Sequence, residues 1–483
     1  MPAQLTTRAQ VNGYRFLLKR YEHALVRRDV RMLHDPMRSQ SRSLLVGAVL
    51  GLLVVAGAAI MSFLRPQGSI DDAKIVMAKE SGALYAVVDG TLHPVLNLAS
   101  ARLITQSNES PTSVKTSKLG ALPRGAMLGI PGAPAALPGS SAGDRSIWTL
   151  CDSVALSKSG SAVGSPGAET TVIAGRLETK AGAVARPTAS GEALLVTRAD
   201  KTYLLFDGKR AEIDPKDSVI AASLSLREKK PRPISPGLLN ATSQVLPIAV
   251  PQIERVGEPG PGKLSNIPVG GVIRVRGVNS EDLYVVLADG VQSISAFTAD
   301  VLRNANSQGM SDITTVPPDR LLGIPYVTRL AVDQFPSGTP KILDAEDAPV
   351  SCMSWEKGAT DPEATVTVLA GRALPLPDHT KPVEIATSDG VRDRVDAVYI
   401  PPSTGEFVQV TGMDPDSVRK GSLFYIADNG IRFGIPDAPT AEILGLEAKP
   451  RQAPWPIIGA LVPGPTLSPS DALVSHDVLP TGH

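Results

Sequence analysis

The feature that most constrains this chain is one uninterrupted apolar run near its amino terminus. Residues 43–64 read SLLVGAVLGLLVVAGAAIMSFL and contain no charged residue, and Arg42 and Arg65 flank them. At about 1.5 Å per residue, a helix of this length reaches roughly 33 Å, enough to cross a bilayer core of about 30 Å. A cleaved signal peptide has a shorter apolar run, of about 7–15 residues. The sequence therefore predicts one transmembrane helix over residues 43–64.

The charges around this run predict its orientation. The chain carries 48 Lys and Arg and 48 Asp and Glu, but residues 1–42 hold nine of the basic residues and three of the acidic ones. Basic segments stay on the cytoplasmic side of a membrane. We therefore expect residues 1–42 in the cytoplasm, a linker over residues 65–82, and the rest in the periplasm, anchored in the inner membrane. A basic end on a mildly acidic body is not typical of a nucleic-acid-binding protein.

The segment before the apolar run predicts an amphipathic helix. It begins with the capping-box pattern Thr7-x-x-Gln10 and is expected to end at Asp35-Pro36. Apolar residues recur at alternating intervals of three and four, so they form an apolar stripe on one face: Val11, Tyr14, Leu18, Tyr21 and Leu25. We expect this stripe to dock on a partner protein. The alternatives are that the helix lies on the anionic inner membrane surface or only extends the span into water.

Four segments after the apolar run resemble one another. Each has a β-rich stretch, an Asp-Gly or Asn-Gly pair, a second short stretch and a helix-like stretch, and they start at Leu84, Tyr203, Leu283 and Leu423. Asp-Gly and Asn-Gly between strands favour a type I′ hairpin turn. Asp214-Pro215 and Asp437 are typical helix starts. Each segment is therefore predicted to fold as a small ββα unit.

A longer duplication encloses these units. LGIP occurs twice, each time followed by a Cys beside a Trp and then by AGR: residues 128–131 with Trp148 and Cys151, and residues 322–325 with Cys352 and Trp355. The same strings in the same order predict two related halves. We expect an α+β, mostly β fold. In it, an elongated extracytoplasmic domain contains two pseudo-twofold related halves that form a central β-domain flanked by four ββα units.

Composition sets the expected boundaries of these parts. Two segments rich in Pro are predicted to be a linker and a tail, which divides the extracytoplasmic chain into residues 83–228 (first half), 229–270 (linker), 271–446 (second half) and 447–483 (tail). Cys151 and Cys352 occupy the same position in the two halves, so in an oxidising exterior they are predicted to form a disulfide. The alternative is two separate buried thiols.

The stretch GEPGPGKL at residues 257–264 nearly matches a phosphate-binding loop. Gly257, Gly262 and Lys263 fit the pattern, but Leu264 replaces the Ser or Thr that binds magnesium. Pro259 and Pro261 lack the N–H groups that cradle phosphate. No strand is predicted before the stretch and no helix after it, so we interpret it as part of the linker and predict no nucleotide site there.

Other candidate motifs are incomplete. Gly139-x-Ser141-x-Gly143 imitates a nucleophile elbow but lies in a Pro- and Gly-rich loop. The six histidines show no ligand spacing, and the acidic clusters near Asp71, Asp344 and Asp361 do not have the ligand spacing of a calcium site. The sequence therefore predicts no catalytic residues, no metal and no cofactor.

Several longer motifs together resemble the EccB family of the mycobacterial type VII (ESX) secretion machinery. They span the chain: TTRAQVNGYRFLLKRYEHALVRRDVRMLHDP, LHPVLNLASARLI, LGIPGAP, WTLCD, CMSW and APWPIIGALVPGPTLSPSDALVSHDVLP. The resemblance implies a subunit of an inner-membrane complex, oligomeric within it, with EccC as motor ATPase, EccD and EccE as membrane subunits, and a mycosin protease outside.

The resemblance implies a scaffold that links the cytoplasmic motor side to a periplasmic assembly for protein export. Two alternatives stay open. Small repeated units outside a membrane also suit a cell-wall-binding module, although the chain has only 8 Tyr, 8 Phe and 3 Trp. Members of the family are often labelled ATPases, a minor alternative because the sequence lacks a complete nucleotide site.

Overall fold

The structure is a computed structural model that divides into two compact units, Met1–Asp71 and Asp72–His483, which are described separately. It describes residues 6–31, 36–64, 70, 73–157, 162, 167–180, 182–277, 281–386, 395–446 and 449–476.

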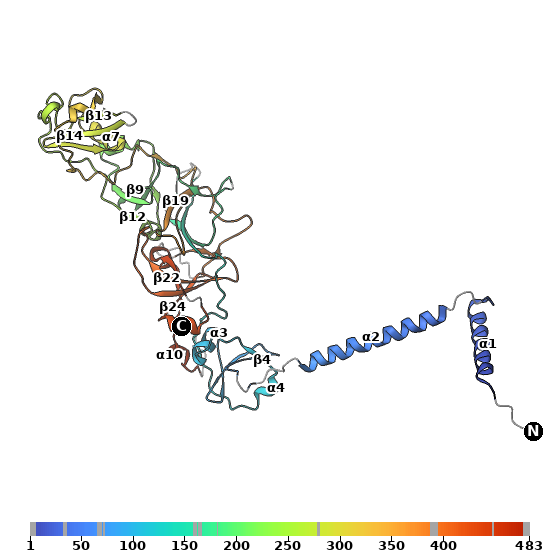
Figure 1. The fold of residues 1–483 in the computed structure, drawn as a ribbon. Helices are drawn as coiled ribbons and strands as arrows, with labels where there is room; N and C mark the ends of the chain where they lie inside the picture. Colours follow the sequence, from blue (N-terminus) through green and yellow to red (C-terminus); the bar gives the residue numbers. More distant parts are fainter. Residues whose placement is uncertain are drawn as a thin grey trace, which may run out of the picture. The chain divides into compact units, whose positions relative to one another are not determined.

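The first unit contains two helices, α1 (Arg8–Arg27) and α2 (Pro36–Leu64) (Figure 1). The side-chain oxygen of Gln10 accepts a hydrogen bond from the Thr7 N–H at 3.0 Å, as the capping pattern predicts. The helix α1 ends earlier than predicted, at Arg27, because Arg28 adopts a left-handed φ of 57°. Within α2, residues Ser41–Met61 are long and apolar enough to cross a membrane.

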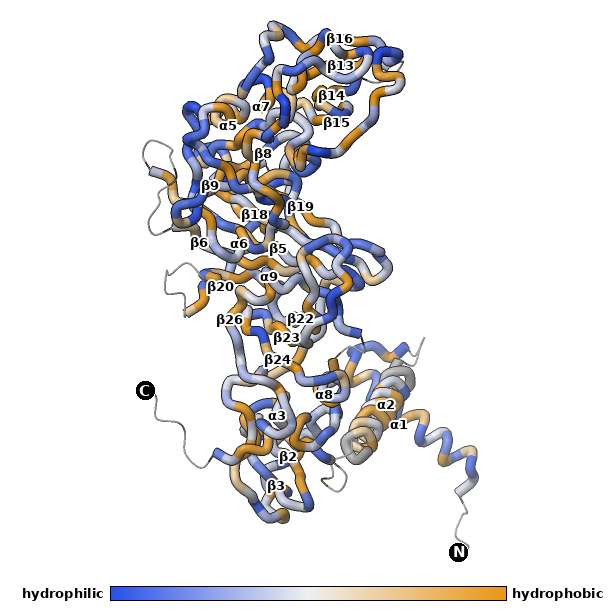
Figure 2. Tube along the Cα trace, turned by 90° about the vertical axis from the view of Figure 1, so that its left-hand side faces the viewer, coloured by the Kyte–Doolittle hydropathy of each residue, from blue (hydrophilic) through white to orange (hydrophobic). Residues whose placement is uncertain are grey.

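A seven-stranded central sheet organises the second unit. Its order is β20-β21-β6-β5-β18-β19-β7. The strands are β5 (Arg145–Val154), β6 (Ala168–Ala174), β7 (Arg186–Pro187), β18 (Val350–Gly358), β19 (Thr365–Gly371), β20 (Val383–Glu384) and β21 (Ala397–Tyr399). The middle pair, β5 and β18, is antiparallel and takes one strand from each predicted half. Hydrophobic residues run along both strands (Figure 2).

Two small sheets are built mainly from the predicted first half of the chain. The order of the first is β3-β2-β1-β4, and that of the second is β11-β8-β9-β10-β12, with β17 also paired to β8. Their strands are β1 (Ile75–Ala78), β2 (Leu84–Val88), β3 (Thr91–Pro94), β4 (Thr112–Val114), β8 (Glu192–Arg198), β9 (Lys201–Phe206), β10 (Lys209–Ile213), β11 (Arg232–Pro233), β12 (Ser243–Gln244) and β17 (Lys341–Ile342). The strand β17 belongs to the second half, so this sheet joins the halves.

Two further small sheets are built mainly from the predicted second half. Their orders are β15-β14-β13-β16 and β25-β22-β23-β24-β26. The strands are β13 (Val272–Arg276), β14 (Glu281–Leu287), β15 (Gly290–Ile294), β16 (Thr314–Val316), β22 (Gly405–Thr411), β23 (Leu423–Ala427), β24 (Ile431–Ile435), β25 (Arg451–Pro454) and β26 (Val462–Pro463). With this content, the predicted mostly β fold is confirmed.

Short helices accompany the sheets. They are α3 (Leu98–Thr105), α4 (Thr116–Leu119), α5 (Ser218–Ser223), α6 (Pro236–Asn240), α7 (Ala296–Ala305), α8 (Ala438–Ile443), α9 (Trp455–Ile458) and α10 (Pro469–Ala472), with 3₁₀ turns η1 (Gly262–Leu264) and η2 (Pro318–Leu321). Asp437 caps α8 as predicted, but the cap of α5 is Asp217 and not Asp214. The Asp214 carboxylate accepts from Lys216 N–H in a turn instead.

The small sheets share hydrophobic cores in pairs. The first and fourth bury one cluster, where Leu103 of α3 meets Leu444 at the end of α8. The second and third bury another, where α5 contacts α7 and Asn304 Nδ2 donates to Ser223 Oγ at 2.9 Å. In Figure 1, α3 accordingly lies near α10 and β24. Each pair combines one sheet from each half of the chain.

The four hairpin turns differ despite their similar sequences. Asp89-Gly90 and Asp207-Gly208 have positive φ at both residues, as a type I′ turn requires. In the third hairpin, Gly290 already pairs with Leu287, so the turn lies one residue earlier. An added Cβ at Gly290 would come within 2.3 Å of the Pro325 oxygen, which explains why Gly stands there. In the fourth, Gly430 alone has positive φ, 81°.

The two LGIP strings do not occupy equivalent places. In the first small sheet, Leu92 N–H donates to the Pro123 oxygen at 2.8 Å, and in the third, Val291 N–H donates to the Pro325 oxygen at 2.9 Å. The second LGIP, which ends at Pro325, therefore corresponds to residues 120–123. The first LGIP follows several residues later. The two LGIP strings therefore agree in sequence but not in structural position. The hydrogen bonds to the hairpins, and not the identical residues, define which positions correspond.

The segments predicted as linker and tail contribute to the fold. Residues 229–270 include α6, η1 and two short strands, with Leu238 and Leu264 buried. Residues 447–483 include β25, α9 and α10, with Ile457 fully buried, while residues 477–483 lie outside the described part. Several of their prolines stand in the first turn of a helix, where the missing N–H costs nothing.

Candidate functional site

The apolar stripe of α1 is exposed. Tyr14, Tyr21 and Leu25 are 65%, 67% and 81% exposed, and Val11 and Leu18 also face solvent. Exposed apolar groups on one helix side are unfavourable in water unless another surface covers them. This stripe is therefore a candidate docking surface in the first unit.

The residues of the phosphate-loop pattern do not adopt the strand–loop–helix geometry of a phosphate-binding loop. Residues before Gly257 form a turn and not a strand, and Gly262 to Leu264 form the three-residue η1 in place of a helix. The Lys263 ammonium donates to the Asp319 carbonyl at 3.2 Å, and Leu264 is completely buried. A working loop needs backbone N–H groups pointing at the ligand from a helix N-terminus.

The acidic clusters near residues 344 and 361 form ion pairs. Asp344 pairs with Lys229 at 2.6 Å, and Asp347 with Arg372 at 3.1 Å. Asp361 pairs with Arg145 at 3.3 Å. Asp71 and Asp72, like His34 and His483, lie outside the described residues. In the part of the chain that the structure describes, no three His, Cys, Asp or Glu side chains are placed to hold a metal ion.

The predicted disulfide is present and lies in the middle of the central sheet. Cys151 on β5 and Cys352 on β18 are paired directly across the two strands, and both are buried. Trp148 and Trp355 form another cross-strand pair on the opposite face, which packs on α6 and α9. The disulfide and the register pair of tryptophans thus lie on the same two strands, where the two halves join.

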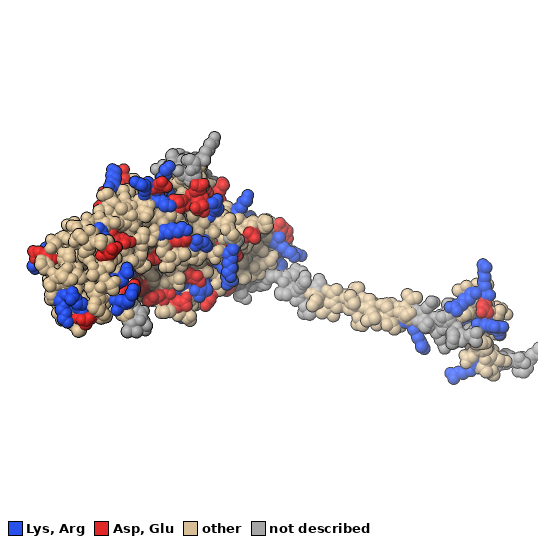
Figure 3. Space-filling model, turned by 90° about the horizontal axis from the view of Figure 1, so that it is seen from above, with Lys and Arg blue, Asp and Glu red and all other residues tan. Residues whose placement is uncertain are grey.

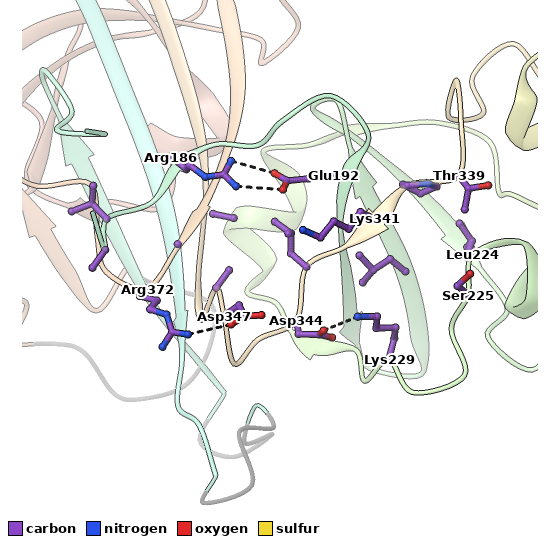
Figure 4. Close-up of a pocket in the computed structure, with 18 of the residues that line it drawn as sticks. Arg186, Glu192, Leu224, Ser225, Lys229, Thr339, Lys341, Asp344, Asp347 and Arg372 are labelled. Atoms are coloured by element: carbon purple, nitrogen blue, oxygen red, sulfur yellow. Dashed lines mark hydrogen bonds and ion pairs between the residues drawn. The ribbon is translucent and has the colours of Figure 1, made fainter. Parts of the chain in front are cut away.

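A charged hollow of about 690 Å³ lies beside the second small sheet (Figure 4). Arg186 makes two hydrogen bonds to Glu192, at 3.2 and 3.3 Å, and the Lys229–Asp344 and Arg372–Asp347 pairs lie along the same hollow. These pairs connect β7, β8 and the loop after β17. Three of its four basic groups pair with its three acidic groups, and Lys341 is the fourth, so most of the charge is balanced within the hollow, as in a joint between segments.

A buried carboxylate, Asp152, fastens α6 to the central sheet. It accepts hydrogen bonds from the Ser235 N–H at 2.6 Å and from the Thr170 hydroxyl at 3.1 Å. Burial raises the pKa of Asp152 to about 6, and the charge of Asp396 adds to this, whereas the hydrogen bonds lower it. The carboxylate has only polar neutral partners, so its role in the fold is structural.

A buried guanidinium, Arg232, fastens the second half to the first. On β11, Arg232 donates to the Ala348 oxygen and to the Leu343 oxygen, the latter at 2.7 Å. Burial lowers the pKa of Arg232 to about 10, so it stays charged at neutral pH.

The sequence model of one family matches almost the whole chain. The family is described as type VII secretion system ESX-1, transport TM domain B, and the match spans residues 3–481. The chain belongs to the EccB family. This agrees with the resemblance of the sequence motifs.

Members of the EccB family from Mycobacterium tuberculosis align over nearly full length. The ESX-1 secretion system ATPase EccB1 is 39% identical over 486 residues, covering 99% of this chain and 97% of that protein. The ESX-3 secretion system ATPase EccB3 is 37% identical over 492 residues, covering 98% and 90%.

Solved structures of EccB complexes share the fold. A chain of an intact ESX-5 inner membrane complex superposes with a TM-score of 0.74 at 32% identity, covering 100% of this chain and 98% of that chain. A chain of the EccB3 dimer from the ESX-3 core complex gives a TM-score of 0.72 at 35% identity, covering 84% and 100%.

Sequence reasoning missed two buried charges of this EccB-family chain, Asp152 and Arg232. Asp152 meets Ser235 83 positions later, and Arg232 meets Ala348 116 positions later. No local pattern encodes such contacts. The one available signal was that Asp152 interrupts a strand whose neighbours are apolar or small.

Proposed function

We propose that this chain is a structural subunit of a type VII secretion complex in the inner membrane. In this arrangement α1 lies in the cytoplasm, α2 crosses the membrane and the second unit lies in the periplasm. The observation that carries the proposal is the match over the entire chain to a subunit of an intact ESX-5 inner membrane complex. The basic residues before α2 support the orientation.

The scaffold role rests on what each unit offers. The exposed stripe on α1 provides a place for a cytoplasmic partner, for which the motor EccC and the membrane subunits EccD and EccE are the candidates. The second unit presents a disulfide-tied β framework, to which other periplasmic subunits or a mycosin protease attach. Among its described residues, no three His, Cys, Asp or Glu side chains are placed to hold a metal ion.

Aspartates in the stripe test the proposal. Tyr14→Asp combined with Leu18→Asp places two charges in the docking surface, so the subunit is expected to leave the complex on a native gel. The matched control, Ala9→Asp with Asn12→Asp, puts the same charges on α1 outside the stripe and is expected to leave the complex intact. An intact complex with both double variants contradicts the docking role.

A further inference from the structure

The helix α1 has a second exposed surface, which starts beside the stripe and continues onto the opposite side of the helix. Arg8, Arg15 and Lys19 follow one another by seven and four residues, and Phe16 precedes Lys19 and Arg20 by three and four. Residues spaced in this way share a helix side. We name Arg8, Arg15, Phe16, Lys19 and Arg20 the basic patch. All five are exposed, Phe16 by 56%.

The basic patch is strongly cationic. Four of its five residues are positively charged, and Glu22 is the one acidic residue in the sequence of α1. In Figure 3, basic side chains gather on this helix. Like charges at this density repel one another, and an anionic surface that binds them relieves the repulsion.

We infer that the basic patch binds the anionic phospholipid headgroups of the membrane that α2 crosses. Lys and Arg clustered beside a membrane-spanning helix are attracted to acidic lipids, with roughly a fivefold gain in binding for each charge near the surface. Phe16, in the middle of the patch, has the size and polarity to enter the headgroup boundary.

The chain keeps α1 close to such a surface. Residues 28–40 join the end of α1 to the candidate span that starts at Ser41. Even fully extended, they reach roughly 45 Å. The patch is therefore held at a high effective concentration near the bilayer, so individually weak lipid contacts suffice.

The patch is centred on a different side of α1 from the stripe, so both can be occupied together. With the patch on lipid, Tyr14, Leu18 and Tyr21 point away from the bilayer, toward a protein partner. The inference rests on the part of the proposed function in which α2 anchors the chain, and not on docking by the stripe. Lipid binding by the patch can be disproved while protein docking by the stripe stands, and the reverse is also true.

Spin labels on the full-length chain in lipid nanodiscs test the inference. The two cysteines of the chain are joined in the disulfide, so an introduced cysteine is the free thiol to label. A label at Asn12→Cys, beside the patch, is expected to become oxygen-accessible in discs of phosphatidylcholine with phosphatidylglycerol, and to stay water-accessible in pure phosphatidylcholine. A label at Tyr14→Cys is expected to stay water-accessible in both.

Charge-reversal variants test whether lipid binding depends on the basic patch itself or only on the total positive charge of the segment. Arg15→Glu with Lys19→Glu is expected to shift the equilibrium toward the free helix by roughly thirtyfold or more, as high salt does. Arg28→Glu with Arg31→Glu makes the same change in net charge outside the patch and is expected to keep the lipid contact. Glu retains high helix propensity, so circular dichroism should show α1 intact in both.

Three results would overturn the inference. The first is equal water access at residue 12 in neutral and anionic discs, which would leave an acidic protein surface as the occupant. The second is equal loss of contact in both charge-reversed variants. The third is lipid contact at residue 14 in place of residue 12, which would also remove the stripe from protein docking.

Discussion

Cys151 and Cys352 face each other across neighbouring antiparallel strands, although 201 positions separate them in the chain. The strands that carry them, β5 and β18, pair along their length, from Val350 opposite Ser153 to Gly358 opposite Arg145. The disulfide therefore reinforces the seam along which the two halves of the second unit are joined.

Removing the disulfide should change both mobility and stability. Cys352→Ala is expected to migrate on a non-reducing gel like the reduced wild-type chain. The free energy of unfolding is expected to fall by about 5 kcal/mol, since the bond closes a long loop. Cys151→Ala with Cys352→Ala serves as the control and should behave identically. Equal mobility of unreduced wild type and Cys352→Ala would contradict the bond.

The buried carboxylate Asp152 should make stability depend on pH. Its folded pKa of about 6 lies above the unfolded value of about 3.9, so the folded state binds the proton more tightly. Its contribution is full below about pH 4 and is lost as the pH rises through about 6, a change of about 3 kcal/mol.

Urea unfolding of the second unit from pH 4 to pH 7 measures this effect. The Asp152→Asn variant is expected to lose that pH dependence, because Asn does not titrate. Asp333→Asn, at an exposed position, should follow the wild-type curve. Parallel curves for wild type and Asp152→Asn would show that the Asp152 carboxyl has the same pKa in the folded and unfolded chain.

Arg232 should be among the most sensitive positions in the fold. Arg232→Met fills much of the same space but leaves the Ala348 and Leu343 oxygens without their donor, which is expected to cost about 2–4 kcal/mol. Arg227→Met, at an exposed position, is the control and should change the free energy of unfolding by less than about 0.5 kcal/mol. Similar unfolding midpoints for both variants would contradict the stabilising role of Arg232.

Lys263 should not support nucleotide hydrolysis. Relatives of this chain carry the name ATPase, but the Lys263 ammonium already bonds the Asp319 carbonyl. Any ATP turnover by the purified chain is therefore expected to be equal in wild type and Lys263→Ala. If Lys263→Ala lowered ATP turnover and Lys209→Ala did not, this result would contradict the prediction and indicate that the loop takes part in hydrolysis.

The parts of the fold that could be predicted are those with local signals. The Asp89-Gly90 and Asp207-Gly208 turns follow from the φ that each residue accepts, and the cap at Asp437 follows from its side chain. The disulfide followed from the order of motifs along the chain. The exposed stripe could be predicted because helix periodicity alone defines it.

The remaining parts depend on contacts between distant segments. The Pro-rich stretch 229–270 looks like a linker until Leu238 and Leu264 enter cores supplied by other parts of the chain. Asp214 looks like a helix cap, but a turn follows β10 first, so the cap of α5 is Asp217. The letters LGIP could not reveal that the two copies meet their hairpins at different positions, the first at Pro94 and the second at Val291.

The shared core of the first and fourth small sheets has a consequence for biogenesis. Ile75 and Leu103, near the start of the second unit, pack with Phe433 and Leu467, near its end. The earliest segment to emerge during synthesis therefore waits for the latest one before its hydrophobic face is covered. In the proposed arrangement, a chain exported from its amino-terminal anchor onward leaves this face uncovered, and open to aggregation and proteolysis, until Phe433 and Leu467 have been delivered.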